Sequence, residues 1–257
     1  MAGAVYSQEL YVFSEPASNM PSKSIGLKLT GRYLRRSDNK FTQRYMPELM
    51  FGINKNWMVH FSSTLSDYYS KKIKWESGKV YVKYRFLSND DVHQHFRMAA
   101  FADAGFTRNP YIYMDANLDG DNDGAQVGLI ATQLVNKLAV SGTVSYMKIF
   151  SESKGEQHAT HSYNMLNYSL STGYLLLPKE YVDYKQTNVN VYLEMLGMQG
   201  LDKSHYCLDL APAIQLIFNS NSKINMGYRF QVAGNMTRMG RQMWQVSLER
   251  TILNAWK

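Results

Sequence analysis

Hydrophobic and polar side chains alternate with a period of two along almost the whole chain, and the helical period of 3.6 is rare. The pattern is clear where Leu208, Leu210 and Ile214 share one face while Asp209 and Gln215 share the other. Such alternation predicts β-strands whose two faces meet different surroundings, in about twelve segments. These segments are residues 24–34, 44–53, 57–65, 79–87, 96–107, 124–135, 138–150, 163–177, 187–198, 204–218, 223–232 and 242–253.

The lengths of the strands and of their connections favour a membrane barrel. Strands of roughly 9–15 residues exceed the 5–6 typical of globular sheets, and tilted strands of this length cross a bilayer. Short turns are expected at 54–56, 88–91, 136–137, 178–185 and 219–222, and longer polar loops at 35–40, 67–74, 108–123, 151–161, 200–203 and 234–241. The two kinds alternate, as they do when all short turns lie at one end of a barrel.

Composition excludes several classes of protein. The chain has 257 residues, of which 45% are hydrophobic and 19% charged, with a mean hydropathy of −0.37. It is too apolar to be disordered, and Cys207 alone cannot build a disulfide scaffold. The densest apolar run, Gly173 to Leu177, stops at Pro178, so no membrane helix of about 18 apolar residues is expected.

The aromatic residues separate a membrane barrel from a soluble β-sandwich, which has the same period of two. The chain has 19 tyrosines, 11 phenylalanines and 4 tryptophans, more than a core of this size usually needs. Tyrosine and tryptophan suit a membrane interface. Many lie near expected strand ends, namely Tyr33, Tyr45, Trp57, Trp75, Tyr84, Tyr146, Trp244 and Trp256. The net charge of +7 is scattered along the strands and forms no patch that would bind nucleic acid.

The closing segment adds a resemblance to a known family. Trp244, Val246, Leu248 and Ile252 alternate toward a late aromatic residue, Trp256. With the strand and turn pattern, this resembles the porin-like outer-membrane β-barrels of Gram-negative bacteria over residues 24–256, although the usual pattern ends on the aromatic itself. The resemblance implies an all-β fold: a single up-and-down antiparallel transmembrane barrel of about twelve strands, with both termini periplasmic.

The amino-terminal region predicts export. Ala2 to Ser7 look like the tail of a secretory signal cleaved before Gln8, with an ordinary cytosolic start as the alternative. Residues 8–23, with Pro16 and Pro21, are expected to form an extended periplasmic lead-in. The division is therefore 1–23 for the signal remnant and lead-in, and 24–257 for the barrel. One cysteine suits an oxidising compartment.

Charged side chains on the polar face of the strands are the expected lining of the lumen, seven cations and five anions. They are Lys28, Arg32, Arg44, Glu48, Lys83, Arg85, Arg97, Asp103, Glu194, Asp209, Arg229 and Glu249. Mixed charges either line a narrow path with a slight anion preference or close into ion pairs that fill the interior.

The favoured function is a passive pore or transporter for a small hydrophilic or ionic solute, surrounded by outer-membrane lipid and lipopolysaccharide. The main alternative is a non-conducting barrel subunit of a larger assembly, acting on other outer-membrane or periplasmic proteins through its loops and residues 8–23. Fold alone does not decide between them.

One loop matches half of a calcium-binding motif. Alternate oxygens surround the ion in such a motif, and a glycine allows the sharp turn. The twelfth position, which should be a bidentate Glu, is Gln126, and no helices flank the loop, so an EF-hand is excluded. A weaker Ca²⁺ site would use Asp115, Asn117, Asp119, Asp121 and Asp123, and the alternative is an acidic loop with no ion.

Two further hypotheses rest on weaker signals. His60 and Ser62 resemble the H-x-S pair of outer-membrane phospholipases, but Ser62 is expected to face the lumen, whereas that family's pair faces lipid. The 15 methionines, including Met46, Met50 and Met58 on the expected lumen face, would suit copper, although flexible packing explains them better.

Overall fold

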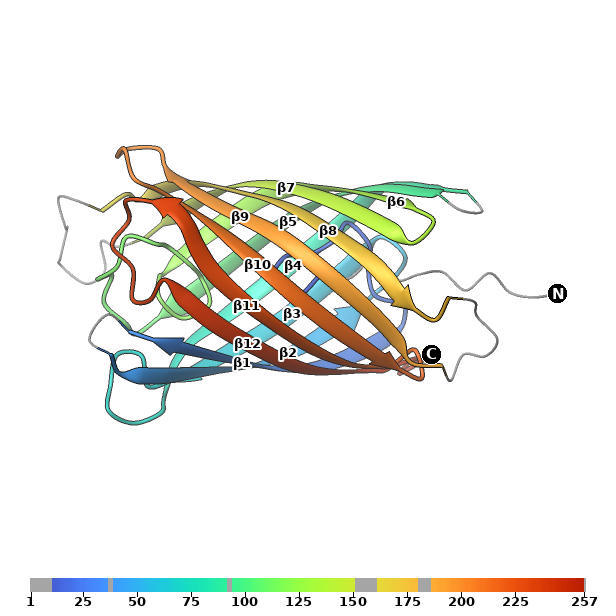
Figure 1. Cartoon of the computed structure of the whole chain (residues 1–257), viewed down its shortest axis with the longest axis horizontal. Coiled ribbons are helices and arrows are strands. Elements are labelled where there is room, and N and C mark those ends of the chain that lie inside the picture. Colours follow the sequence, from blue (N-terminus) through green and yellow to red (C-terminus); the bar gives the residue numbers. More distant parts are fainter. Residues whose placement is uncertain (1–10, 37–38, 92–93, 151–160, 180–185, 257) are drawn as a thin grey trace.

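The computed structural model is a closed barrel of twelve antiparallel strands and describes residues 11–36, 39–91, 94–150, 161–179 and 186–256 (Figure 1). The strands are β1 (Ser24–Arg35), β2 (Phe41–Gly52), β3 (Trp57–Ser66), β4 (Lys74–Asp90), β5 (Gln94–Thr107), β6 (Gly124–Val135), β7 (Leu138–Ile149), β8 (Asn164–Leu177), β9 (Asn188–Gly200), β10 (Tyr206–Phe218), β11 (Ser222–Gly234) and β12 (Gln242–Ile252). The all-β fold class and the strand number predicted from the sequence are confirmed.

Each strand pairs with its neighbours in sequence, and β1 pairs with β12 to close the ring. The closing register sets Ile25 opposite Ile252 and Leu34 opposite Met243. Closure pairs the backbone groups that an open sheet would leave at its edges, which suits a chain surrounded by lipid. In the part of the chain that the structure describes, no helix is long and apolar enough to cross a membrane.

One strand is longer than its pattern predicts. The expected segment 79–87 is the middle of β4, whose ladder to β5 continues as far as Asp90 opposite His95. The alternation is broken by register shifts between Thr64 and Leu65 on β3 and between Arg85 and Leu87 on β4. A bulge changes which face each residue occupies while backbone pairing goes on, so a strict period of two misses the ends of this strand.

The two faces of the wall differ as the alternation predicts. Outward side chains such as Leu29, Leu248 and Val144 are about half exposed, whereas the inward Ser171 and Gln215 are almost fully buried. An apolar exterior around a polar interior reverses the arrangement of a soluble β-sandwich and is the arrangement of a transmembrane barrel.

Aromatic side chains lie on the outer surface at both ends of the barrel. The rings of Trp57 and Tyr84 lie 4.6 Å apart near the short turns, and those of Trp75 and Phe106 lie 5.7 Å apart near the long loops. Two aromatic bands flanking an apolar zone are typical of barrels that sit between two membrane interfaces.

The chain enters and leaves the barrel at the end that carries the short turns. The Ala255 N–H donates to the Lys23 carbonyl at 2.8 Å, which ties the exit of β12 to the entry of β1. The longer connections, including 108–123 and 235–241, gather at the opposite end (Figure 1). We call these the short-turn end and the long-loop end.

Candidate channel lumen

The twelve side chains predicted to line the lumen lie on the inward-facing positions of their strands. Five border cavities inside the barrel, namely Lys28, Arg32, Glu48, Asp103 and Arg229. Arg44, Lys83, Glu194 and Asp209 are almost completely buried. Their role in selectivity stays a prediction, because a position on the wall does not measure ion flow.

The remaining predicted side chains lie near the short-turn end. Arg97 donates to the Asp90 carboxylate at 2.7 Å and to the Ser18 hydroxyl at 2.9 Å. Lys223 and Glu249 form an ion pair at 2.6 Å. Arg85 follows Lys83 on the same face and is half-buried.

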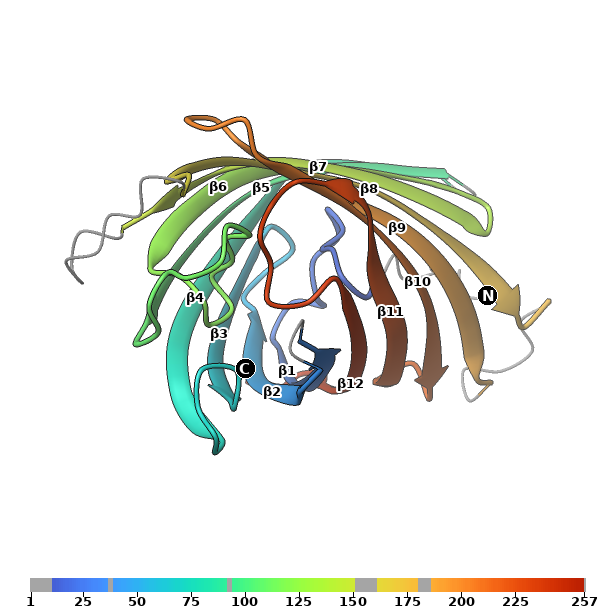
Figure 2. The same cartoon turned by 60° about the vertical axis from the view of Figure 1, so that its left-hand side comes forward.

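The amino-terminal segment lies inside the barrel. Figure 2 shows it, in fainter blue than β1, within the ring of strands. We call its described part, residues 11–20, the inner segment. The sequence predicts an extended periplasmic lead-in here. Instead, Tyr11 packs edge-on against Tyr192 at 5.6 Å. Phe13 lies over Gly227, where a Cβ would fall 2.5 Å from its ring, so only glycine allows this approach.

Buried charges on the wall hold the inner segment. The Glu194 carboxylate accepts the backbone N–H groups of Val12, Phe13 and Ser14 at 2.8, 2.9 and 2.8 Å. The Lys83 ammonium donates to the carbonyls of Pro16 and Ser18 at 2.7 and 2.8 Å. Charge-assisted bonds of this kind are shorter and stronger than neutral ones.

Neutral bonds add to the attachment. The Ala17 N–H donates to the Thr132 hydroxyl at 2.9 Å, and the Gln245 side-chain amide donates to the Val12 carbonyl at 2.8 Å. With the Arg97–Ser18 bond and a bond between the Ser14 and Ser171 hydroxyls, the inner segment is bonded to β4, β5, β6, β8, β9 and β12 across the lumen.

The loop 108–123, which we call the inward loop, enters the lumen from the other end. Asp119 forms ion pairs with Arg32 at 2.9 Å and with Lys79. Asp121 pairs with the buried Arg44. The Thr107 hydroxyl donates to the Gly120 carbonyl at 2.7 Å, which fixes the turn of the loop against the wall.

Opposite charges set the ionisation of this loop. Burial raises the pKa of Asp119, but the nearby Lys79 and Arg32 more than offset burial, so the pKa lies below its ordinary value. The pKa of Asp121 is also below its ordinary value, because the attraction of the Arg44 guanidinium outweighs the effect of burial. At Asp115 burial outweighs the attraction of Arg238, so its pKa is raised.

The predicted calcium ligands do not form one oxygen cage. Asp115 pairs with Arg238 at 2.9 Å, and Asp119 and Asp121 pair with other cations. Asn117 donates to Asp121, and Asp123 accepts the Thr107 N–H. Within the described ranges, no group of three or more His, Cys, Asp or Glu is arranged to hold a metal. The acidic residues therefore serve to dock the inward loop on basic side chains.

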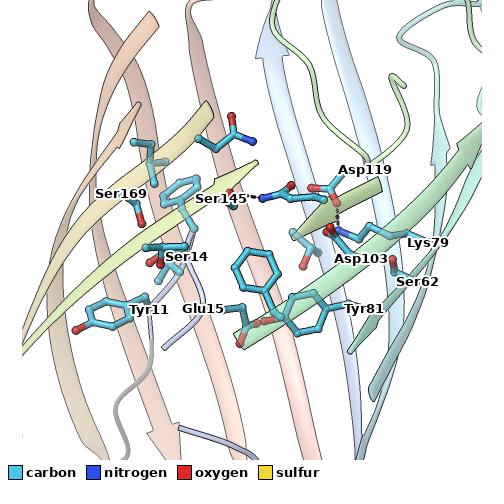
Figure 3. A pocket seen from close by; sticks show the side chains of 18 of the residues that line it. Tyr11, Ser14, Glu15, Ser62, Lys79, Tyr81, Asp103, Asp119, Ser145 and Ser169 are labelled. Atoms are coloured by element: carbon cyan, nitrogen blue, oxygen red, sulfur yellow. Dashed lines mark hydrogen bonds and ion pairs between the residues drawn. The ribbon is translucent and has the colours of Figure 1, made fainter. Parts of the chain in front are cut away.

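Two adjoining cavities remain between these obstructions. The first has a volume of about 340 Å³ and lies between the inner segment and the inward loop. Figure 3 shows Lys79 pointing toward Asp119 on one side of it, with Asp103 beside them and Glu15 and Tyr81 below. The second, of about 310 Å³, lies toward the long-loop end. Both are bordered by Arg32, Lys79, Asp103, Asp119 and Arg229, so the two cavities meet at a ring of mixed charge.

His60 and Ser62 face this lumen and not the membrane. His60 Nδ1 lies 2.7 Å from a Glu48 oxygen, and its side chain is only 5% exposed. Ser62 borders the first cavity. The pair thus lacks the lipid-facing position of the phospholipase motif that it resembles.

Several lumen residues escaped the sequence prediction. Lys79 lies on the same face of β4 as Lys83, and Lys223 lies on the same face of β11 as Arg229. A stricter use of the period of two would therefore have predicted both in the lumen. Arg238 lies on a loop and Glu15 on the inner segment. Their inward position depends on how irregular backbone folds back, for which the period carries no signal.

Comparison of the sequence with protein-family models and with curated proteins finds no match. Solved structures do match. An outer-membrane channel from Pseudomonas putida F1 is 12% identical, with a TM-score of 0.60 over 94% of this chain and 100% of that one. The KdgM porin is 11% identical, with a TM-score of 0.51 over 88% and 98%.

The fold also occurs in an autotransporter. The β domain of the Bordetella autotransporter BrkA is 11% identical, with a TM-score of 0.50 over 88% of this chain and 98% of that one. At these identities the likeness concerns the fold alone. This chain has the fold of the porin-like outer-membrane β-barrels.

Proposed function

We propose that the protein is a passive pore of the bacterial outer membrane for a small hydrophilic or ionic solute. The observation that carries this proposal is the pair of adjoining cavities inside a closed barrel, bordered by charged side chains of both signs. A barrel that served only as a scaffold could fill its interior with packed side chains, whereas here polar space continues past the inward loop.

The proposed orientation places the short-turn end in the periplasm and the long-loop end outside the cell. Short periplasmic turns and longer external loops are the rule in such barrels. The entry into β1 at Lys23 and the exit from β12 at Ala255 then face the periplasm. Membrane lipid, with lipopolysaccharide at the outer leaflet, would contact the apolar exterior.

The charge ring supplies the selectivity in this proposal. Arg32, Lys79 and Arg229 face Asp103 and Asp119 around the junction of the cavities. Fixed charges at a constriction attract counterions and repel ions of like charge. The three cations against two anions predict a slight preference for anions.

Planar-bilayer recording of the purified protein tests the pore. Steady single-channel steps, with a reversal potential that shows anion preference in a salt gradient, support the proposal. Protein that is folded and inserted, yet carries no current, contradicts it.

A second candidate function follows from the inner segment. Its bonds to Glu194 and Lys83 hold it inside the lumen, where it would obstruct flow in a non-conducting subunit. Such a subunit would copurify in stoichiometric amount with an envelope protein, and removal of those bonds would not produce current.

A further inference from the structure

Sulphur-bearing side chains gather at one place in the lumen wall. Met147, Met165 and Cys207 are buried together, and the less buried Met198 packs against them. The same buried cluster includes Met236, from the loop 235–241, and the apolar side chains Ala116, Leu118 and Ile149, and Met114 from the inward loop packs on it. We call the six sulphur-bearing side chains the sulphur cluster.

Strand pairing makes this convergence a property of the barrel wall. Met147 on β7 is the direct partner of Met165 on β8, and Met198 on β9 is the direct partner of Cys207 on β10. Direct partners on one face have Cβ atoms about 5 Å apart. The long, unbranched methionine side chain then allows several sulphur atoms to reach one ion.

Most methionines of the strands face the lumen and not the lipid. The strands contain ten methionines, and the outward face of a membrane barrel is its apolar face. Three face outward, namely Met98, Met195 and Met226. The other seven face the polar lumen, namely Met46, Met50, Met58, Met147, Met165, Met198 and Met243.

The cluster has a route of access. Met147 and Met198 border the second cavity, and Met198 also borders the first. An ion that entered the lumen from the long-loop end would therefore meet thioether sulphur before it reached Cys207, which is 1% exposed.

We propose that the sulphur cluster binds a soft monovalent metal ion such as Cu(I). Thioether and thiolate ligands select Cu(I) over hard cations. On binding, the Cys207 Sγ–H bond breaks, its proton leaves to solvent and an Sγ–Cu(I) bond forms, while copper keeps its oxidation state. The thiolate and the ion together carry no net charge, as the thiol did, whereas a divalent ion would leave a buried positive charge.

Competition with a coloured chelator tests this site independently of the pore. Detergent-purified protein is titrated without oxygen, in ascorbate, against the Cu(I) complex of bathocuproine disulfonate, and loss of colour reports transfer. We expect the folded protein to take up Cu(I). Substitution of Met147, Met165 and Met198 together by Leu should weaken uptake by at least ~100-fold, because three ligands are lost.

The outward methionines supply the matched control. Substitution of Met98, Met195 and Met226 together by Leu should leave uptake unchanged. Methionine-to-leucine changes conserve volume and usually cost under about 1.5 kcal/mol each, and the heat-dependent gel mobility of folded barrels checks both variants. Equal uptake by the two triple variants, or no transfer to the folded wild-type protein, overturns the proposal.

A single substitution keeps the test decisive if the inward triple variant fails to fold. The charged groups that act on the Cys207 thiol are Arg238, Asp209, Asp115 and Arg229. Because a proton leaves Cys207, the wild-type affinity should fall by about tenfold for each unit of decreasing pH. Cys207→Ser should weaken binding and abolish that dependence. Identical pH profiles for the two proteins would overturn the role of the thiol and with it the site.

Discussion

Asp119 is the residue at which the inward loop, the wall and the cavities meet. Its carboxylate pairs with Arg32 and Lys79, and it borders both cavities. Asp119→Asn removes one of the two anions of the charge ring and leaves its three cations. We expect the reversal potential in a salt gradient to move toward stronger anion preference.

Asp202→Asn is the matched control for this change, since Asp202 lies on the exposed loop 201–205 and accepts the Tyr163 N–H outside the lumen. Its reversal potential should equal that of the wild-type protein. An equal shift in both variants would show that surface charge, and not the ring, sets the preference.

The pH dependence of Asp119 has a definite sign. The pKa of Asp119 is lowered in the folded protein. The stabilisation from its ion pairs is therefore complete above the ordinary pKa of 3.8 and is lost as the pH falls through the lowered pKa. The difference in reversal potential between wild-type protein and Asp119→Asn should therefore persist from about pH 8 to about pH 5. Loss of that difference near neutral pH would contradict the pairing with Arg32 and Lys79.

At the scale of elements, the inner segment is the part most open to test. Glu194→Gln keeps the shape of the side chain but removes the charge that accepts three N–H groups. A hydrogen bond to a charged group contributes about 1.5–3 kcal/mol, so the fraction of barrels with a released segment should rise by about tenfold or more. In single-channel recordings, the openings should last longer or the current steps should be larger.

Asp202→Asn is again the control, because Asp202 lies outside the lumen. Its conductance should stay at the wild-type level. If Glu194→Gln behaves like Asp202→Asn, the inner segment does not limit conduction.

The elements also show how far the sequence could predict the fold and the site. The period of two identified the strands and placed Arg44, Glu194 and Asp209 inward, because each strand separates two unlike surroundings. The same pattern is silent about irregular backbone. The inner segment and the inward loop are held by contacts over 100 residues apart, such as Val12 with Glu194, or between elements, such as Asp121 with Arg44. The spacing in the acidic loop carries no signal of the arginine and lysine side chains with which Asp119 and Asp121 pair.

At the scale of the whole molecule, the placement in a membrane predicts that the cost of an arginine on the outer face depends on its depth in the bilayer. Leu248 faces outward midway along β12, paired with Leu29, whereas Leu253 follows the end of that strand. Leu248→Arg should destabilise the folded barrel in lipid by about 2–4 kcal/mol, and Leu253→Arg by about 0–1 kcal/mol. Denaturant unfolding in vesicles measures both. Equal costs at the two positions would contradict a bilayer around the centre of the barrel.

The central claim is that ions cross the membrane through this lumen, and blockade at a chosen lumen position tests it most directly. Ser169 borders the first cavity, and its neighbour Leu170 is 47% exposed on the outer face. Each is replaced by Cys in a Cys207→Ser background, and an anionic methanethiosulfonate reagent is added during planar-bilayer recording. The account predicts that current through Ser169→Cys falls in a discrete step while current through Leu170→Cys is unchanged. Unaltered current through a modified Ser169→Cys, or no current in any of these proteins, would contradict it.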